Sequence, residues 1–244
     1  IKKGLEIHYQ GDLQKNSGLG TSSAFCVGLF NTLYNIEKKK VSKKKLSLNA
    51  IHVEQKMLKE NCGSQDQIWA AYGGFNIIKF NKDGKFFVYP IKKSKKNLKK
   101  LDKNMFLVYT GINRFSENIE KDKIKNIDKN FKNLDKINYI TNTFIKEMGS
   151  NFTIDLCGDL MNEYWDIKKR LSTKVTNPFI NELYKEGLNN GAIGGKIIGS
   201  GGGGFLLFCC KKNKQKKFLN GFKRLPIIKF KFTDSGSEVI FKNS

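Results

Sequence analysis

The sequence contains no run of about 18 apolar residues, the length that a membrane-spanning helix needs, and no recognisable signal peptide. It also lacks any C-x-x-C pair. The five cysteines (Cys26, Cys62, Cys157, Cys209 and Cys210) follow no metal-binding or disulfide spacing. These absences argue against a helical membrane protein and a disulfide-stapled secreted domain. They predict reduced, buried thiols and a cytoplasmic location.

Arginine is scarce, although the chain is strongly basic. Three of the 45 basic residues are arginine (Arg114, Arg170 and Arg224), and the formal net charge is +23. Proteins that read bases specifically rely on arginine, and the lysines here are scattered along the chain. We therefore expect a solvated, lysine-rich surface and no specific nucleic-acid partner. A basic polyanion-binding protein is the alternative from a different class, and salt-sensitive binding to polyanions is expected in either case.

Three common catalytic signatures are incomplete. A Walker A loop requires Ser or Thr after its lysine, but Ile197 follows Lys196. No predicted strand is followed by G-x-G-x-x-G and a helix, which excludes the Rossmann fingerprint. A zinc deaminase needs H-x-E and P-C-x-x-C, and the chain has only the first half, at His52-Val53-Glu54.

Hydrophobic patterning predicts a globular α+β fold, in which helices and strands are mixed without a regular βαβ rhythm. The lysine-rich segment 92–103 is expected to link two domains, 1–95 and 96–244. The expected helices lie at about 21–36, 43–59, 68–72, 124–148, 152–171, 178–190 and 213–224. The expected strands lie at about 5–10, 75–80, 85–91, 104–110, 227–233 and 238–242, with two more around a glycine-rich stretch at 199–204.

Another glycine-rich stretch, Ser17–Ala24, directly precedes an apolar run with helical spacing. Ser and Thr are good N-cap residues, and glycine lets backbone N–H groups approach a ligand. Such a loop at a helix N-terminus suits a phosphate, and the hydroxyls of Thr21, Ser22 and Ser23 can offer an oxygen to Mg²⁺. An ordinary capped helix explains the same pattern equally well.

Two carboxylates complete the candidate chemistry. Glu54 belongs to a predicted helix with an apolar inner face, and Asp66 enters the next helix twelve positions later. One carboxylate suits a hard cation, and the other can accept a proton from an attacking hydroxyl. Spacing alone is also consistent with a solvent-facing glutamate and with an aspartate that interacts with a helix dipole.

Several motifs, in order along the chain, resemble one enzyme family. Gly18-Leu19-Gly20-Thr21-Ser22-Ser23-Ala24 resembles the second motif of the GHMP small-molecule kinases, and Gly199-Ser200-Gly201-Gly202-Gly203-Gly204 resembles their third. Within this family the chain is most similar to D-glycero-D-manno-heptose 7-phosphate kinases. The stretches that carry this narrower resemblance are Gln65–Asn76, Thr110–Ser116 and Val175–Pro178.

The resemblance implies a two-lobed kinase, with an N-terminal lobe like domain 2 of ribosomal protein S5 and a ferredoxin-like C-terminal lobe. It implies transfer of the γ-phosphoryl group of ATP to the anomeric hydroxyl of a heptose 7-phosphate, with Mg²⁺ as cofactor. The product, a heptose 1,7-bisphosphate, would serve the synthesis of nucleotide-activated heptose. The small-molecule substrates, ATP and a sugar phosphate, are the implied partners.

The family pattern also implies a role for each matching residue. The residues that would hold the ATP phosphates are Gly18, Leu19, Gly20, Thr21, Ser22 and Ser23. Ser22 and Glu54 would bind Mg²⁺, and Asp66 would be the catalytic base or orient the hydroxyl. The second glycine-rich loop, with Ser200, Gly201, Gly202 and Gly203, would shape the site around nucleotide and sugar. Arg114 and Lys169 are either contacts to the substrate phosphate or ordinary surface cations.

The chain departs from the family pattern in three places. The first motif is absent and the chain begins at Ile1, so we expect a missing N-terminal piece. The family has Pro and Gly ahead of the first loop where this chain has Gln14 and Asn16, and the heptose kinases have Lys where it has Ser64. Two alternatives within the family therefore stay open: a kinase for another sugar or sugar phosphate, and an inactive, incomplete chain.

Overall fold

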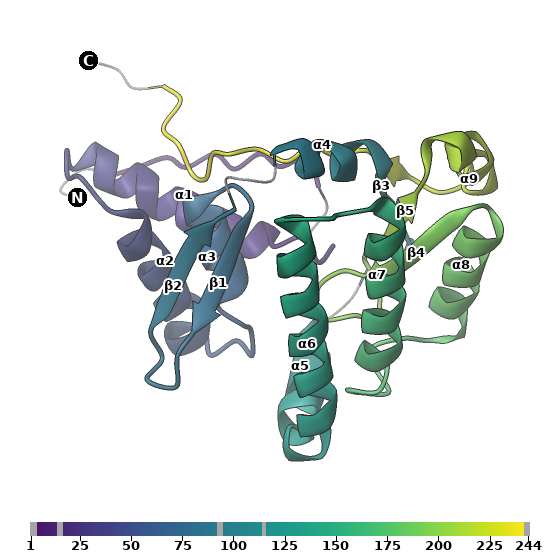
Figure 1. Cartoon of the computed structure of the whole chain (residues 1–244). Coiled ribbons are helices and arrows are strands. Elements are labelled where there is room, and N and C mark those ends of the chain that lie inside the picture. Colours follow the sequence, from purple (N-terminus) through teal and green to yellow (C-terminus); the bar gives the residue numbers. More distant parts are fainter. Residues whose placement is uncertain (1–3, 14–16, 92–94, 114–115, 242–244) are drawn as a thin grey trace. The chain divides into compact units, whose positions relative to one another are not determined.

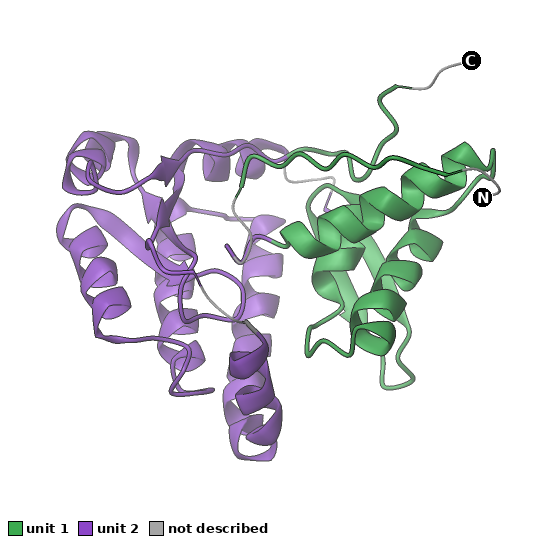
Figure 2. Ribbon diagram, turned by 180° about the vertical axis from the view of Figure 1, so that it is seen from behind, with its two compact units in different colours: residues 1–15, 20–90, 233–244 green, residues 16–19, 91–232 purple. Residues whose placement is uncertain are grey.

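The computed structural model describes residues 4–13, 17–91, 95–113 and 116–241, and the chain divides into two compact units (Figure 2). The first unit consists of residues 1–15, 20–90 and 233–244, and the second of residues 16–19 and 91–232. Helices and antiparallel strands are mixed (Figure 1), which confirms the predicted α+β class. Within the described ranges, no helix is both long and apolar enough to cross a membrane.

Helices form most of the first unit. They are α1 (Thr21–Ile36), α2 (Lys43–His52), the π-helical turn η1 (Val53–Met57) and α3 (Gln65–Tyr72). α2 begins as predicted, because the Ser42 hydroxyl accepts the N–H of Lys45. The three α-helices share a small core made of Cys26, Val27, Leu46, Ala50 and Ala71. This core fixes the N-terminus of α1 and the two carboxylates of interest within one unit.

The first unit also contains a hairpin and a returning segment of chain. β1 (Asn76–Phe80) and β2 (Phe86–Pro90) lie where strands are expected, and they pair in antiparallel register. Residues 233–241 form no strand, which corrects the predicted strand at 238–242 for its described part. Instead, the N–H of Ser237 donates to the carbonyl of Ala70 on α3 at 2.9 Å, and the amide of Asn31 on α1 donates to the carbonyl of Ser237 at 3.1 Å. The segment therefore ties α1 to α3.

The second unit is built on a four-stranded antiparallel sheet. Its strands are β3 (Met105–Tyr109), β4 (Ala192–Ile197), β5 (Phe205–Cys210) and β6 (Ile227–Ile228), in the spatial order β4-β5-β3-β6. Helices connect β3 to β4 and β5 to β6, whereas the second glycine-rich loop joins β4 directly to β5. This order of strands and crossings is the ferredoxin-like arrangement, and it confirms the expected C-terminal lobe.

Helices on the sheet complete the second unit. α7 and α8 contact β4, and the core between sheet and helices includes Trp165, Phe208, Phe218 and Phe222. The Asn177 side chain caps α8, which begins at Pro178, the first residue of the helix expected at 178–190. The helices, in order, are α4 (Lys95–Asn104), α5 (Ser116–Lys125), η3 (Asp128–Asn130), α6 (Phe131–Met148), α7 (Ile154–Lys168), α8 (Pro178–Asn189), η4 (Lys212–Lys214) and α9 (Gln215–Gly221).

Four further expectations about secondary structure differ from the structure. Residues 5–10 form no strand, because no strand of the described chain pairs with them, and the side chains of Leu5, Ile7 and Tyr9 are exposed. The single helix expected at 124–148 is divided by the 3₁₀ turn η3. The expected linker contains α4, which forms because Leu101 is buried among the residues of its unit. The strand expected at 227–233 is only two residues long.

Candidate active site

The first glycine-rich loop leads into the N-terminus of α1, as predicted. Gly18 and Gly20 have φ angles of 82° and 70°, a region that side chains disfavour. Gly20 occupies the N-cap position, so no Ser or Thr side chain caps this helix. The first N–H groups of a helix have no partner within it, and here they belong to Thr21, Ser22 and Ser23. The geometry therefore leaves the helix end suited to an anion.

Glu54 contacts this helix end directly. It is 2% exposed and lies on η1, where a π-helical turn continues α2. The Ser22 hydroxyl donates to Glu54 Oε1 at 3.0 Å, and the Ser23 hydroxyl donates to Oε1 at 3.2 Å and Oε2 at 2.9 Å. The structure thus brings three predicted site residues together, and the alternative of a solvent-facing glutamate is wrong.

Gln67 is a site residue that the sequence analysis missed. It is fully buried on α3, and its Nε2 donates to Glu54 Oε2. The same nitrogen lies 3.7 Å from Cys62 Sγ, whereas Gln67 Oε1 has no hydrogen-bond partner among the described atoms. Its position directly after Asp66, inside the stretch Gln65–Asn76 that resembles the heptose kinases, is the signal that could have identified it.

Two thiols lie near the Glu54 carboxylate. Burial, followed by the negative charge of Glu54, raises the pKa of Cys26 and of Cys62 to about 11. Both thiols are therefore protonated at neutral pH. All five cysteines are free, and Cys62 alone among them is not fully buried, which largely confirms the predicted reduced, buried thiols.

Asp66 lies beside the first glycine-rich loop. It is half-buried in the first turn of α3, where a carboxylate also interacts favourably with the helix dipole. A Cβ atom added to Gly20 would lie 3.3 Å from both Cγ and Oδ2 of Asp66. The carboxylate proposed as a base is therefore next to the loop proposed to hold phosphates.

The oxygen atoms around Glu54 fit a magnesium ion that is held partly by phosphate. Ser22 Oγ and Glu54 Oε1 are 3.0 Å apart. Hydroxyl and carboxylate oxygens are hard donors of the kind that Mg²⁺ prefers. Within the described ranges, no group of three His, Cys, Asp or Glu side chains could hold a metal by itself. A site with two protein oxygens suits Mg²⁺, which keeps waters and phosphate oxygens as its other ligands.

The second glycine-rich loop packs tightly in the second unit. A Cβ atom added to Gly201 would lie 2.6 Å from the carbonyl oxygen of Val175, and one added to Gly203 would lie 2.6 Å from that of Ile112. Ser200 is buried. Side chains are therefore excluded from this loop by backbone on both sides.

The two glycine-rich loops meet within the second unit. A Cβ atom added to Gly204 would lie 2.2 Å from the carbonyl oxygen of Ser17, at the entry to the first loop. The N–H and the hydroxyl of Thr110 both donate to the carbonyl of Gly204, at 2.9 and 2.8 Å. The boundary between the two units falls after Leu19, inside the first loop.

One of the two candidate phosphate contacts can be placed. Lys169 pairs with Asp166 at 2.7 Å, whereas Arg114, like Gln14 and Asn16, lies outside the described residues. The preceding residue, Lys168, contacts the second loop instead. It is 4% exposed, and its ammonium group donates to the carbonyls of Ile197, at 3.1 Å, and Gly199. Nothing in the sequence alone distinguished these adjacent lysines.

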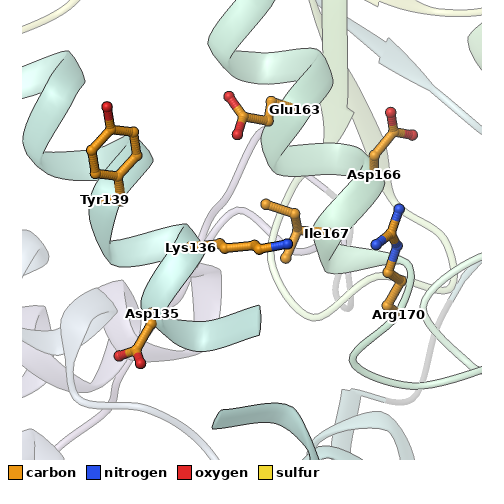
Figure 3. A pocket seen from close by; sticks show the side chains of 7 residues that line it. All are labelled: Asp135, Lys136, Tyr139, Glu163, Asp166, Ile167 and Arg170. Atoms are coloured by element: carbon orange, nitrogen blue, oxygen red, sulfur yellow. The ribbon is translucent and has the colours of Figure 1, made fainter. Parts of the chain in front are cut away.

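A pocket of about 500 Å³ lies between α6 and α7 (Figure 3). Lys136 extends from α6 toward Ile167 on α7, and the lining carries both charges. The lining residues are Asp135, Lys136, Tyr139, Glu163, Asp166, Ile167 and Arg170. None of them was predicted as a site residue, and the mixed charges favour no single class of ligand.

Comparisons with known proteins give consistent matches along the chain. The family model for the N-terminal domain of GHMP kinases matches residues 1–74, and that for the C-terminal domain matches residues 148–226. A relative from Campylobacter jejuni, D-glycero-alpha-D-manno-heptose 7-phosphate kinase, is 27% identical over 95% of this chain and 69% of its own length. A bifunctional fucokinase/GDP-fucose pyrophosphorylase of Arabidopsis thaliana is 27% identical over 81% of this chain and 19% of its own length.

Solved structures share the fold. A D-glycero-D-manno-heptose 1-phosphate kinase from Bacteroides thetaiotaomicron has a TM-score of 0.71 at 22% identity, covering 92% of this chain and 64% of its own. A putative sugar kinase from Campylobacter jejuni has a TM-score of 0.67 at 25% identity, covering 92% of this chain and 65% of its own. The chain thus spans about two thirds of the length of these relatives.

The solved structures confirm the predicted two-lobed fold. The predicted enzyme class is confirmed because both family models describe kinase domains and the Campylobacter relative is a kinase. Both family models occur in the expected order, each on the part of the chain that carries the corresponding glycine-rich loop. The chain therefore belongs to the GHMP kinase family.

Proposed function

We propose that the chain is an ATP-dependent kinase that phosphorylates the anomeric hydroxyl of a heptose 7-phosphate. The observation that carries the proposal is the contact of Ser22 and Ser23 with buried Glu54 at the start of α1, with Asp66 beside the same loop. An anion site, a cation-binding carboxylate and a base candidate within one unit are the parts that phosphoryl transfer needs. The heptose substrate is suggested by the name of the 27% identical relative.

The first loop is proposed to hold the ATP phosphates. Gly18, Leu19 and Gly20 would let backbone N–H groups approach the phosphate oxygens, because two of these residues are glycines with positive φ. The N–H groups of Thr21, Ser22 and Ser23 would add the positive end of the α1 dipole. Such fixed dipoles neutralise charge that builds up during transfer without having to reorganise.

Ser22 Oγ and Glu54 would hold the magnesium ion. When bound, Mg²⁺ neutralises charge on the phosphate oxygens. Glu54 is kept in one orientation by Ser23 and Gln67, which each donate to its Oε2. Those two residues therefore position the carboxylate rather than bind substrate.

Asp66 is the proposed base. Its carboxylate would accept the proton of the anomeric hydroxyl as that oxygen attacks the γ-phosphorus atom, and the bond from phosphorus to the leaving oxygen of ADP breaks. The proton then passes to solvent. Its place beside Gly20 supports this role, because a base must lie within reach of the phosphates.

Ser200, Gly201, Gly202 and Gly203 are proposed to shape the site around nucleotide and sugar. A contact from Lys169 or Arg114 to the 7-phosphate stays a prediction, and Ser64, where heptose kinases have lysine, favours keeping a second candidate. That candidate is a GHMP kinase for another sugar or sugar phosphate. We also propose a cytoplasmic location, where ATP and the sugar phosphates are available.

The decisive experiment measures ADP release by the chain with Mg·ATP and a panel of sugars and sugar phosphates. Turnover with heptose 7-phosphate, and little with galactose, fucose or mevalonate, is expected. Turnover with a different sugar would support the second candidate. Two results would contradict the proposal: ADP release at the same rate whether or not an acceptor is added, and no ADP release with any acceptor.

A further inference from the structure

We propose that Lys123 and Lys168 are positioning residues for the second glycine-rich loop, which comprises residues 198–204. This proposal deepens the proposed function, on which its catalytic consequence rests. The two lysines belong to different helices, α5 and α7. The ammonium groups of both donate hydrogen bonds to backbone carbonyls of this loop, and that of Lys168 also donates to the carbonyl of Ile197, directly before it.

Three carbonyls are involved. Lys168 donates to those of Ile197 and Gly199, and Lys123 donates to that of Ser200 at 2.8 Å. Lys168 is almost completely buried, and Lys123 is held in place by an ion pair with Glu120 at 2.9 Å. Burying an ammonium group is costly unless its hydrogen bonds are made, so these contacts are specific features of the loop.

The contacts determine which way the peptide groups face. No described peptide bond is cis, and in a trans peptide the C=O and the following N–H point in opposite directions. With the carbonyls of Gly199 and Ser200 held by the lysines, the N–H groups of Ser200 and Gly201 turn away from the lysine side. A charged donor on the carbonyl also polarises the peptide and strengthens its N–H as a donor.

The loop needs this support because of its composition. The loop contains four glycines in succession, Gly201 to Gly204. Glycine gains more backbone conformational entropy than other residues when it leaves its folded conformation, so the loop needs contacts to stay ordered. The N–H groups of Gly202 and Gly204 are held by the carbonyls of Val175 and Ile112, on one side of the lysine contacts. On the other side the N–H of Ile198 pairs with Phe205. The lysines therefore fix the stretch between these anchors, which belongs to the loop proposed to shape the site around nucleotide and sugar.

Hydrogen exchange measured by mass spectrometry tests the proposal directly. We expect Lys168→Met and Lys123→Met to speed exchange of residues 198–204 by about tenfold to a hundredfold, the loss expected for one or two charge-assisted bonds. Exchange in β5, directly after the loop, should not change. The matched controls are Lys169→Met and Lys121→Met, which remove neighbouring lysines whose ion pairs are with Asp166 and Glu117. In both controls, exchange of residues 198–204 should match that of the wild type.

Unchanged loop exchange in both test variants would overturn the proposal, as would equal acceleration in the controls. If Lys168→Met does not fold, Lys123→Met decides, because Lys123 lies nearer the surface. Kinetics add a second readout. With Mg·ATP and heptose 7-phosphate, Lys123→Met should lower kcat/KM about tenfold, Lys123→Arg should recover part of it, and Lys121→Met should retain it. A wild type without turnover would refute the proposed function and leave the exchange result to decide the loop.

Discussion

The Ser23 hydroxyl lies within hydrogen-bond distance of both carboxylate oxygens of Glu54, at 3.2 and 2.9 Å. This contact joins the first turn of α1 to the π-helical turn after α2, two segments about thirty positions apart in the sequence. Both residues are buried. A carboxylate that is withdrawn from water depends on such donors, so the contact has consequences for both stability and chemistry.

Ser23→Ala should lower the free energy of unfolding by about 2 kcal/mol, because it removes a buried hydrogen bond to a charged acceptor. Urea unfolding at neutral pH measures this change. The control is Ser47→Ala, which removes a buried hydroxyl that donates, within the described chain, to the carbonyl of Lys43 in its own helix. That carbonyl keeps its helical partner, so the control should cost clearly less. Equal decreases in the free energy of unfolding of the two variants would show that the contact of Ser23 with Glu54 contributes no more to stability than an ordinary hydroxyl contact within a helix.

Gly20→Ala should impair activity more than stability. The residue has a φ of 70°, where alanine costs about 1 kcal/mol, and the new Cβ would lie 3.3 Å from the Asp66 carboxylate. We expect a loss of at least about tenfold in kcat/KM, since small displacements of reacting groups are costly. Gly28→Ala is the matched control. Nothing lies within 4 Å of its added Cβ, and alanine should stabilise α1 by about 0.5–1 kcal/mol. Wild-type activity in Gly20→Ala would contradict the placement of Asp66.

The Cys62 thiol predicts a loss of stability at alkaline pH. Its pKa is raised to about 11 in the folded chain, against 9.0 for an ordinary thiol, by burial and by the charge of Glu54. Between pH 9 and 11 the unfolded state therefore binds fewer protons than the folded state at this site. The stabilising contribution is complete below pH 9 and is lost as the pH rises toward 11.

Urea unfolding of wild type and Cys62→Ser, in reductant at pH 8, 9, 10 and 11, checks this prediction. Serine does not ionise in this range, and its hydroxyl can still accept a hydrogen bond from Gln67. The stability difference between wild type and variant should therefore shrink as the pH increases. Parallel pH profiles would mean that the Cys62 pKa is not raised.

Local signals predicted much of the fold. The glycines before α1, the Asn-Pro start of α8 and the turn between β1 and β2 each act through the conformational preferences of a few adjacent residues. For the same reason, the positions of Asp66 and of the second loop could be expected from their motifs. The strand expected at 5–10 does not form, because a strand needs a neighbouring strand to pair with, and the local sequence does not show whether one is available.

The parts of the site that were missed depend on tertiary contacts. That Glu54 is buried against Ser22 and Ser23 follows from the packing of α1 on α2 and from the π-helical turn, which the predicted helix did not contain. Lys168 and Lys169 are adjacent residues of the same type at the end of α7. Because their side chains point in different directions, Lys168 contacts Gly199 and Lys169 contacts Asp166. Directions of this kind are set by the whole fold.

The phosphoryl transfer itself is tested most directly by ³¹P NMR of the chain mixed with Mg·ATP and D-glycero-D-manno-heptose 7-phosphate. The account predicts a new resonance of a phosphate on the anomeric oxygen, growing in step with ADP, in the wild type. In Asp66→Asn, the rate should fall at least about a thousandfold while ATP still binds, because the amide cannot accept the proton. A wild type that forms no sugar 1-phosphate, or an Asp66→Asn variant that forms it at the same rate, would contradict the account.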